Sequence, residues 1–184
     1  MPGLSRVIVV IFGVASIASG AIGFVNCPGS DRTAGASRSE GIILVDAKRR
    51  LTPFDTWNES ISRLEPNLLA ALQNAARAAE ADGVTIEVNW GWRSPETQQR
   101  LLDDAVKRYG SYEAARQYVQ TPEGSKHVAG QAVDIGSAPA IRWMNDHGPR
   151  FGLCRIYANE SWHFELAADE LGNCPPLRPD AAGE

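Results

Sequence analysis

Hydrophobic and polar residues alternate along residues 42–174 with two different periods, which predicts a mixture of helices and strands. Within 64–81, leucines and alanines recur every three or four residues, with Pro66 near the start and Gly83 just past the end. This is the pattern of an amphipathic helix with ordinary boundaries. Residues 84–90, VTIEVNW, alternate apolar and polar side chains and include β-branched residues. They indicate a strand with one buried face.

The rest of this region contains a second long helix and several short elements. Ser94, Pro95 and Glu96 offer an N-cap oxygen, a first-turn proline and a negative charge at the start of a helix that should run to about residue 108. Shorter helices are expected at 112–119 and 141–147, and short strands at 132–135 and 162–166. The pattern therefore predicts an α+β domain in which a small, mainly antiparallel sheet packs against helices.

Length and charge limit the organisation and the class of function. A chain of 184 residues with 43% hydrophobic residues can bury one core of ordinary size. We therefore expect a single domain over 42–174, an irregular proline-containing tail over 175–184, and a monomer. The net charge of −4 argues against a nucleic-acid-binding protein, because such proteins need a basic face to neutralise phosphates.

The N-terminal residues differ from the rest of the chain. Arg6 precedes an uncharged, apolar run over 7–25, which is typical of a secretory signal peptide. The run also has about the 20 residues that a spanning helix needs, so 1–25 is interpreted as a signal peptide or a membrane anchor, with a buried helix as the other reading. Residues 26–41 are rich in Gly, Ser and Thr, which predicts a flexible linker. Cleavage or anchoring would place the domain outside the cytoplasm, secreted or tethered to the cell membrane.

The three cysteines are consistent with export. Cys154 and Cys174 flank the last predicted strand, and a disulfide between them would close a loop that contains His163. Cys27 is left over, and a lipid anchor there is disfavoured because Asn26 stands where lipoprotein signals carry a small residue. A nucleophilic thiol is the remaining alternative, but neither Cys154 nor Cys174 has neighbours that would lower its pKa.

One candidate functional residue is a carboxylate in an apolar strand. Asp134 lies between Val133 and Ile135, where a charge is costly unless it is paired or bound to a cation. A hydrogen-bonded structural aspartate is the alternative. Of the three histidines, His147 precedes Gly148 at the end of a predicted helix and is interpreted as structural, because it complements the helix dipole.

The other two histidines can join Asp134 in a metal site. His127 precedes a glycine-containing turn ahead of Asp134, and His163 lies in the last predicted strand on the same face as Glu165. Two imidazoles and one carboxylate leave the fourth position of a zinc ion open for water. Glu160, just before the strand, can take a proton from that water, which makes the predicted site hydrolytic.

Two strings of residues carry a family resemblance. SKHVAGQAVD over 125–134 and ESWHFE over 160–165 resemble the motifs of zinc D-Ala-D-Ala carboxypeptidases and dipeptidases of the VanY and VanX type. GWRS over 91–94, followed by the helix that bears Gln98, resembles that family's arginine segment. The resemblance extends over 55–171 and implies a fold like that of the hedgehog and D-Ala-D-Ala peptidase proteins.

The resemblance implies one zinc ion and the roles of five residues. His127, Asp134 and His163 would bind the zinc. Glu160 would be the general base that activates water and then protonates the leaving amine. Arg93 would stabilise the developing oxyanion or the carboxyl end of the substrate, and a surface ion pair is the alternative for this arginine.

The resemblance also implies a substrate. Ser125 and Gln98 would hydrogen-bond it, unless they are only turn and helix-surface residues, and Glu165 would orient a ligand rather than bind zinc. The implied reaction is hydrolysis of the C-terminal D-Ala-D-Ala bond of peptidoglycan stem peptides. Two rivals stay open, namely an endopeptidase that cuts the L-Ala-D-Glu bond and a non-catalytic, zinc-containing module that binds the cell wall.

Overall fold

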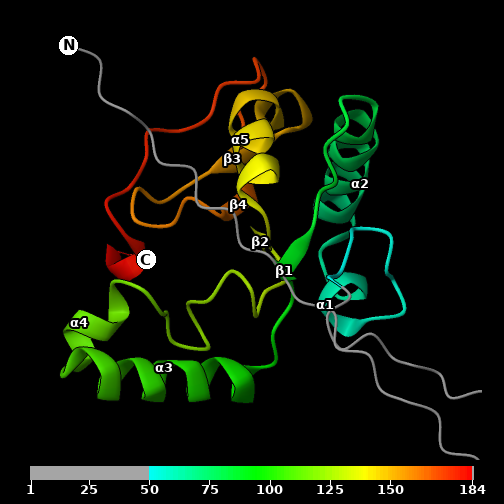
Figure 1. Cartoon of the computed structure of the whole chain (residues 1–184). Helices are drawn as coiled ribbons and strands as arrows, with labels where there is room; N and C mark the ends of the chain where they lie inside the picture. The colour runs from blue at the N-terminus through cyan, green and yellow to red at the C-terminus, as the bar shows by residue number, and fades with distance from the viewer. Residues whose placement is uncertain (1–49, 184) are drawn as a thin grey trace, which may run out of the picture. The chain divides into compact units, whose positions relative to one another are not determined.

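The computed structural model describes residues 50–183, which include all of the predicted zinc ligands and catalytic residues (Figure 1). The predicted signal or anchor segment, 1–25, and the predicted linker, 26–41, lie outside the described residues, as does Cys27. Within 50–183, no helix is long and apolar enough to cross a membrane.

Four short strands form one antiparallel sheet in the order β1-β2-β4-β3. Their bounds are Val88–Trp90 for β1, Ala132–Ile135 for β2, Leu153–Arg155 for β3 and His163–Leu166 for β4. Asp134 of β2 pairs with His163 of β4 and, on the other side, with Trp90 of β1. The register therefore places two of the predicted metal ligands directly opposite each other on neighbouring strands.

The main core lies between the sheet and two helices, α2 (Pro66–Ala81) and α5 (Ala138–His147). The apolar stripe of α2 is buried through Leu68, Leu72, Ala75, Ala76 and Ala79. From the sheet and α5 the core receives Val133, Ile135, Phe164, Trp143 and Met144. Burial of this apolar surface fixes the sheet against the helices and so fixes the strand ends that carry polar residues.

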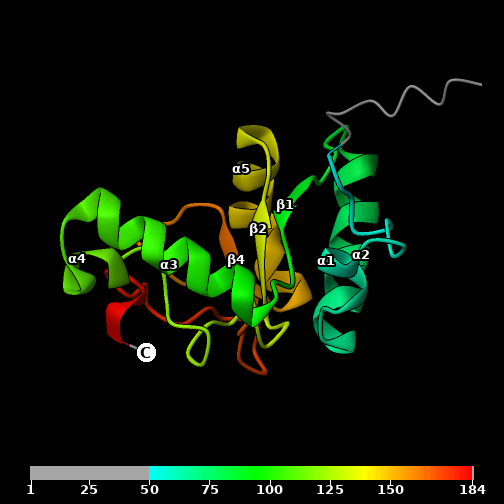
Figure 2. The ribbon, with the colours of Figure 1, turned by 90° about the horizontal axis from the view of Figure 1, so that it is seen from below.

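Two further helices, α3 (Pro95–Tyr109) and α4 (Tyr112–Arg116), form a hairpin with its own small core. Leu102, Ala105 and Ala115 are buried between them. Figures 1 and 2 both show this hairpin on a different side of the strands from α2, with α3 running past one end of β1. The hairpin therefore faces the strand ends rather than the main core.

Side-chain caps fix the starts of α3 and α5, and the predicted start is confirmed for α3. The side chain of Ser94 accepts a hydrogen bond from Thr97 N at the start of α3, as expected. The helix predicted at 141–147 begins earlier, at Ala138, because Ser137 caps it through the backbone N–H of Ala140. The helix predicted at 64–81 is α2, and it begins at Pro66 because proline is tolerated in the first turn.

The strands agree less closely with their predicted ranges. β2 matches 132–135, whereas the strand predicted at 84–90 is paired only over Val88–Trp90. Its pairing with β2 is short and has a register irregularity between Val88 and Trp90. The helix predicted at 112–119 ends at Arg116, and the strand predicted at 162–166 begins at His163. Four elements were not predicted, namely α1 (Glu59–Ser62), β3 and two short 3₁₀ helices, η1 (Gly148–Phe151) and η2 (Ala181–Gly183).

A disulfide joins Cys154 of β3 to Cys174 and holds the segment that follows against the sheet. The backbone N–H of Arg178 donates to Ile156 O, and the N–H of Ala158 donates to Arg178 O. A short 3₁₀ helix, η2 (Ala181–Gly183), follows. Part of the segment predicted as an irregular tail is thus packed on the β3–β4 connection.

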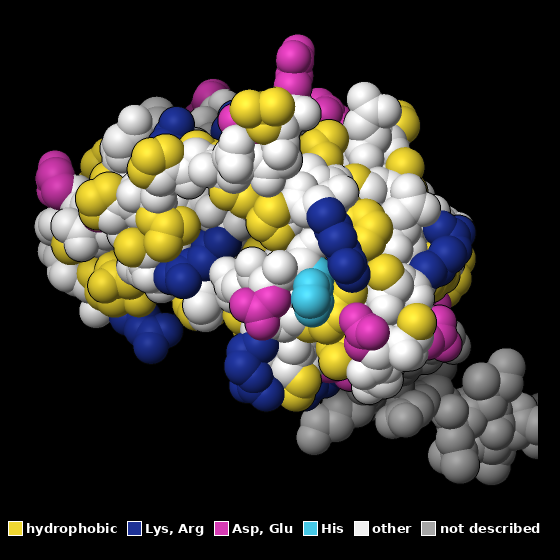
Figure 3. All heavy atoms as spheres, turned by 90° about the horizontal axis from the view of Figure 1, so that it is seen from above, with side chains coloured by type: hydrophobic (Ala, Val, Ile, Leu, Met, Phe, Trp, Pro, Cys, Tyr) yellow, Lys and Arg dark blue, Asp and Glu magenta, His cyan; other side chains and the backbone are white. Residues whose placement is uncertain are grey.

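The surface carries charges of both signs. On the face shown in Figure 3, Lys and Arg side chains are interspersed with Asp and Glu side chains, and apolar side chains lie between them. This face offers no continuous basic patch for a phosphate backbone, which agrees with the negative net charge of the chain.

Candidate metal centre and active site

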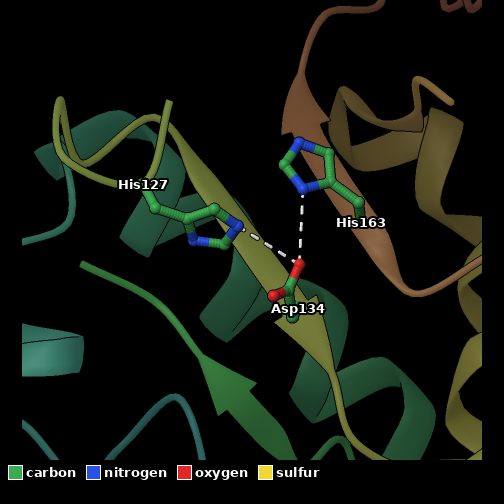
Figure 4. A group of neighbouring side chains, drawn as sticks. All are labelled: His127, Asp134 and His163. Atoms are coloured by element: carbon green, nitrogen blue, oxygen red, sulfur yellow. Dashed lines mark ion pairs between the residues drawn. The ribbon is translucent and has the colours of Figure 1, made fainter. Parts of the chain in front are cut away.

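Three side chains converge from three places in the chain (Figure 4). Asp134 comes from β2 and His163 from β4, which are paired, and His127 comes from the turn that precedes β2. All three residues are buried, and their ligand atoms lie within 4.8 Å of one another. The structure therefore brings together the three residues that the sequence predicted as metal ligands.

One carboxylate oxygen is the common point of the cluster. His127 Nε2 lies 3.2 Å and His163 Nδ1 lies 3.3 Å from Asp134 Oδ1. Despite these short distances, neither Asp134 Oδ1 nor His163 Nδ1 makes a hydrogen bond of acceptable geometry. Buried polar atoms without hydrogen bonds are costly. A cation between these atoms would remove that cost, so the donor set fits a metal ion.

The second polar atom of each of these residues is held by another group. The Nδ1–H of His127 donates to the Gly91 carbonyl at 2.7 Å, and the Nε2–H of His163 donates to Glu165 Oε1 at 3.0 Å. These bonds fix the tautomers and leave one lone pair of each ring facing the cluster. Two neutral imidazole nitrogens and one carboxylate oxygen are the donors that zinc prefers.

Burial and charge shift the pKa values of these groups in opposite directions. Burial would raise the pKa of Asp134, but His127 and His163 hold it well below its usual range. Burial lowers the pKa of His163, yet its contacts with Asp134 and Glu165 outweigh burial and raise the value to about 9. Burial keeps the pKa of His127 below its usual value. Without a metal, the contacts with Asp134 and Glu165 thus favour the doubly protonated form of the His163 ring, whereas burial favours the neutral form of His127.

Glu160 lies at the edge of this cluster. Its Oε2 atom is 3.7 Å from His163 Nδ1, and only 12% of its side chain is exposed. The residue precedes β4, so its carboxylate is next to the ligand atoms without being one of the three that converge on a common point. This is the place required of a base that acts on a group bound at the metal.

Arg93 braces the cluster from the loop before α3. It donates from one terminal nitrogen to Asp134 Oδ2 at 2.8 Å and from the other to Gln98 Oε1 at 3.2 Å, and it stacks over the Trp90 ring at 5.0 Å. Burial lowers the pKa of Arg93, and Asp134 and Glu160 oppose that shift. The guanidinium remains charged at neutral pH.

The two predicted substrate-binding residues have different surroundings. Ser125 is buried and lines the cleft, and its hydroxyl has no hydrogen-bond partner among residues 50–183. Gln98 also lines the cleft, but its amide oxygen accepts from Arg93 and its amide nitrogen donates to Gln120 O at 2.9 Å. Gln98 is therefore occupied with holding Arg93.

A cleft of about 580 Å³ opens beside the three converging side chains. Its walls at this end include His127, Asp134, Glu160 and His163, and the half-exposed ring of Trp162. The cleft then continues past Arg93 toward the α3–α4 hairpin, where aromatic residues line it. A reacting group can thus reach the three ligand atoms from solvent.

Comparison with known proteins identifies the family. Residues 61–169 match the family described as VanY, D-alanyl-D-alanine carboxypeptidase. The chain belongs to the VanY family. A D-alanyl-D-alanine carboxypeptidase of Enterococcus faecalis (strain ATCC 700802 / V583) is 30% identical over 165 residues, which are 74% of this chain and 62% of that relative. The chain thus spans less than two thirds of the length of the curated VanY relative that it matches.

Solved VanY structures share this fold. A mutant of the vancomycin resistance D,D-pentapeptidase VanY from a VanB-type cassette, in complex with Zn(II), is 31% identical, with a TM-score of 0.52 over 55% of this chain and 71% of that one. VanYB in complex with D-alanine-D-alanine is 28% identical, with a TM-score of 0.55 over 59% of this chain and 74% of that one. These matches confirm the predicted α+β fold with its small antiparallel sheet.

Sequence reasoning missed several groups that shape the VanY-type site. The Gly91 carbonyl that holds His127 is a backbone group, although the position of Gly91 directly before Trp92 and Arg93 hinted at a close approach. The Tyr157 ring lies 5.0 Å from the ring of His163. No sequence pattern marks this tyrosine, because its place depends on the path of the β3–β4 connection.

Proposed function

We propose that this chain is a zinc-dependent D-alanyl-D-alanine carboxypeptidase that removes the terminal D-alanine from peptidoglycan stem peptides. The observation that carries the proposal is the convergence of His127 Nε2, Asp134 Oδ1 and His163 Nδ1 beside Glu160 at the end of an open cleft. Membership of the VanY family and the substrate name of the Enterococcus relative support the choice of reaction.

His127, Asp134 and His163 would hold the zinc ion through the three atoms that face one another. A zinc ion with three protein ligands supplies Lewis-acid activation of a water molecule and of the scissile carbonyl. Among residues 50–183, the group of possible metal ligands at this position consists of these three side chains, without a fourth. An open position is the feature that separates a catalytic zinc site from a structural one, and it argues against the wall-binding alternative.

Glu160 is the residue that moves protons in this proposal. Its carboxylate accepts a proton from the attacking water and then donates that proton to the amine of the departing D-alanine. The distance of 3.7 Å from Glu160 Oε2 to His163 Nδ1 and the limited exposure of the Glu160 side chain support this role.

Arg93 and Ser125 bind the substrate in this proposal. Two of the five N–H groups of Arg93 bond to Asp134 and Gln98, so others are available for a substrate oxygen that gains negative charge. The Ser125 hydroxyl is available for a second hydrogen bond. Gln98 holds Arg93 in place and acts only through it.

The place of action follows from the substrate. Stem peptides are part of the cell wall, so the domain would act outside the cytoplasm. Export through residues 1–25, either as a cleaved signal peptide or as an uncleaved anchor, would deliver it there. The Cys154–Cys174 disulfide is consistent with an oxidising compartment.

The test is a product analysis with the full chain. The zinc-loaded protein is incubated with L-Ala-γ-D-Glu-L-Lys-D-Ala-D-Ala, and the products are identified by mass spectrometry. The proposal expects free D-alanine and a tetrapeptide, with no cleavage in a chelator-treated control. Cleavage between L-Ala and D-Glu would instead establish the endopeptidase, and a stoichiometric zinc content without any turnover would establish a non-catalytic module.

A further inference from the structure

The cleft follows one face of α3 away from the metal cluster. Gln98, Leu101, Arg108 and Tyr109 all line it. Residues spaced by three, ten and eleven positions from Gln98 lie on one face of an α-helix, because three turns take about eleven residues. Gln98 contacts Arg93 at the metal end, so Arg108 and Tyr109 mark the far end of the same cleft.

The part of the cleft between Gln98 and Arg108, called the arm below, is longer than the single C-terminal residue of a peptide substrate requires. From Gln98 to Arg108, α3 rises by about 15 Å, at roughly 1.5 Å per residue. An extended peptide covers about 3.3 Å per residue, so the arm accommodates four or five residues. A carboxypeptidase leaves only one residue beyond the scissile bond. The arm must therefore receive the part of the substrate that precedes this bond.

The far end of the cleft is aromatic and positively charged. The rings of Tyr109 and Tyr118 stack with their centroids 4.6 Å apart, and both side chains are partly exposed. Arg108 lies over the Tyr109 ring at 5.7 Å. Both acidic residues that line the cleft, Asp134 and Glu160, belong to the metal end.

Two exposed cations, Lys107 and Arg108, stand side by side at this helix end and differ in their surroundings. Lys107 Nζ pairs with Asp104 Oδ1 at 3.0 Å and does not line the cleft. Arg108 lines the cleft, and among residues 50–183 it makes no ion pair. Its planar fork, held against a tyrosine ring, suits a carboxylate from a bound ligand.

We propose that Arg108, supported by Tyr109 and Tyr118, binds a carboxylate on a substrate residue that precedes the scissile bond. The site would make the enzyme select stem peptides that carry a free carboxylate in this region over peptides in which that group is an amide. This inference rests on the proposed carboxypeptidase activity, because the activity defines which part of the substrate enters the arm.

The test uses two pentapeptides that differ in one group. One is L-Ala-γ-D-Glu-L-Lys-D-Ala-D-Ala, and the other carries an amide in place of the free α-carboxylate of its D-Glu residue. For the wild-type full chain with zinc, we expect kcat/KM for D-alanine release to be about fivefold higher with the carboxylate peptide at low salt, mostly through KM. The preference should weaken as salt screens the contact.

Three variants and one short substrate separate the possible outcomes. Arg108→Gln should treat the two pentapeptides alike, whereas Lys107→Gln, which removes the same charge one residue away, should keep the preference. Neither change should affect release from diacetyl-L-Lys-D-Ala-D-Ala, which lacks the upstream carboxylate. Equal rates for both pentapeptides in the wild type, or an unchanged preference in Arg108→Gln, would overturn the proposal.

The remaining variant tests the other unpaired cation of the cleft. Lys126 also lines it and makes no ion pair among residues 50–183. If Lys126→Gln removes the preference and Arg108→Gln does not, the carboxylate site lies elsewhere and the proposal is wrong. If no peptide releases D-alanine, including the short one, then the carboxypeptidase assignment has failed and the subsite fails with it. If the short peptide releases D-alanine but the wild type does not distinguish the two pentapeptides, the carboxypeptidase assignment stands and only the proposed carboxylate subsite is overturned.

Discussion

Each predicted ligand residue has one polar side-chain atom that faces the other two residues and a second that contacts a supporting group. His127 is held by Gly91, Asp134 by Arg93, and His163 by a carboxylate on its own strand. The convergence of these three residues could be predicted, because few histidines occur and a carboxylate in an apolar strand needs a partner. Which of their atoms face one another could not be predicted, because this depends on which backbone and side-chain groups lie nearby after folding.

The first prediction concerns zinc content. His127→Ala, Asp134→Ala and His163→Ala should each lose stoichiometric zinc, because two protein ligands remain. His147→Ala is the matched control, since this third histidine packs beside Trp143 with a ring distance of 4.8 Å and has no part in the cluster. Metal analysis after dialysis measures the effect. Full zinc content in any of the three ligand variants would remove that residue from the site.

The second prediction concerns protons. Because the pKa of His163 is raised to about 9 in the metal-free protein, zinc must displace a proton from this ring at neutral pH. The apparent affinity should therefore rise about tenfold per pH unit between pH 7 and 8 and level off above pH 9, where the ring is already neutral. Titration with a competing chelator measures this slope. The Glu165→Gln variant removes one cause of the raised pKa of His163, so its zinc affinity should level off at a lower pH than that of the wild type.

At the scale of elements, sequence predicts long helices and buried strands better than short ones. α2 and α3 have strong periodicity and clear boundary signals, so their ranges agree with prediction within two residues. β3 has three residues, which is too short for any period to show, and β1 is paired over only three of the residues whose alternation predicted a strand at 84–90. The paired length depends on the partner strands β4 and β2, and pairing between distant segments is not visible in a single sequence.

The third prediction concerns the close approach of β1 to α1. A Cβ atom on Gly91 would lie 2.1 Å from Ser60 O, so the backbone of Gly91→Ala must shift. The free energy of unfolding should fall by about 1–3 kcal/mol, and zinc affinity should fall because the Gly91 carbonyl holds His127. Denaturant unfolding and zinc titration measure both effects. Gly183→Ala is the control, because a Cβ there meets no atom within 4 Å and should change neither value.

At the scale of the whole domain, the disulfide holds the C-terminal segment against the site. Gln120, which bonds to Gln98 through its carbonyl, also donates from its side chain to Ala181 O. Ala181 packs with Tyr157, whose ring lies beside His163. The C-terminal segment thus supports two walls of the cleft. The prolines of this segment predicted only irregular backbone, since they give no indication of where that backbone packs.

The fourth prediction follows from the length of the closed loop. The two cysteines are 20 residues apart in sequence, and closing such a loop stabilises the folded state by about 3 kcal/mol in the chain-entropy model. The double variant Cys154→Ala/Cys174→Ala should lose that amount in denaturant unfolding. A reducing agent should lower the stability of the wild type and leave the double variant unchanged. Equal stability of the oxidised wild type and the double variant would show that the bond adds nothing.

We propose above that His127, Asp134, His163 and Glu160 form a hydrolytic zinc site. The most direct test compares D-alanine release from a D-Ala-D-Ala pentapeptide by the zinc-loaded wild type and by Glu160→Gln, with the zinc content of both measured. Glu160→Gln should keep one zinc per chain, because Glu160 is outside the group of three proposed ligands, and kcat should fall by about 10²- to 10⁴-fold. A Glu160→Gln protein with full zinc content and the full wild-type rate would contradict this account.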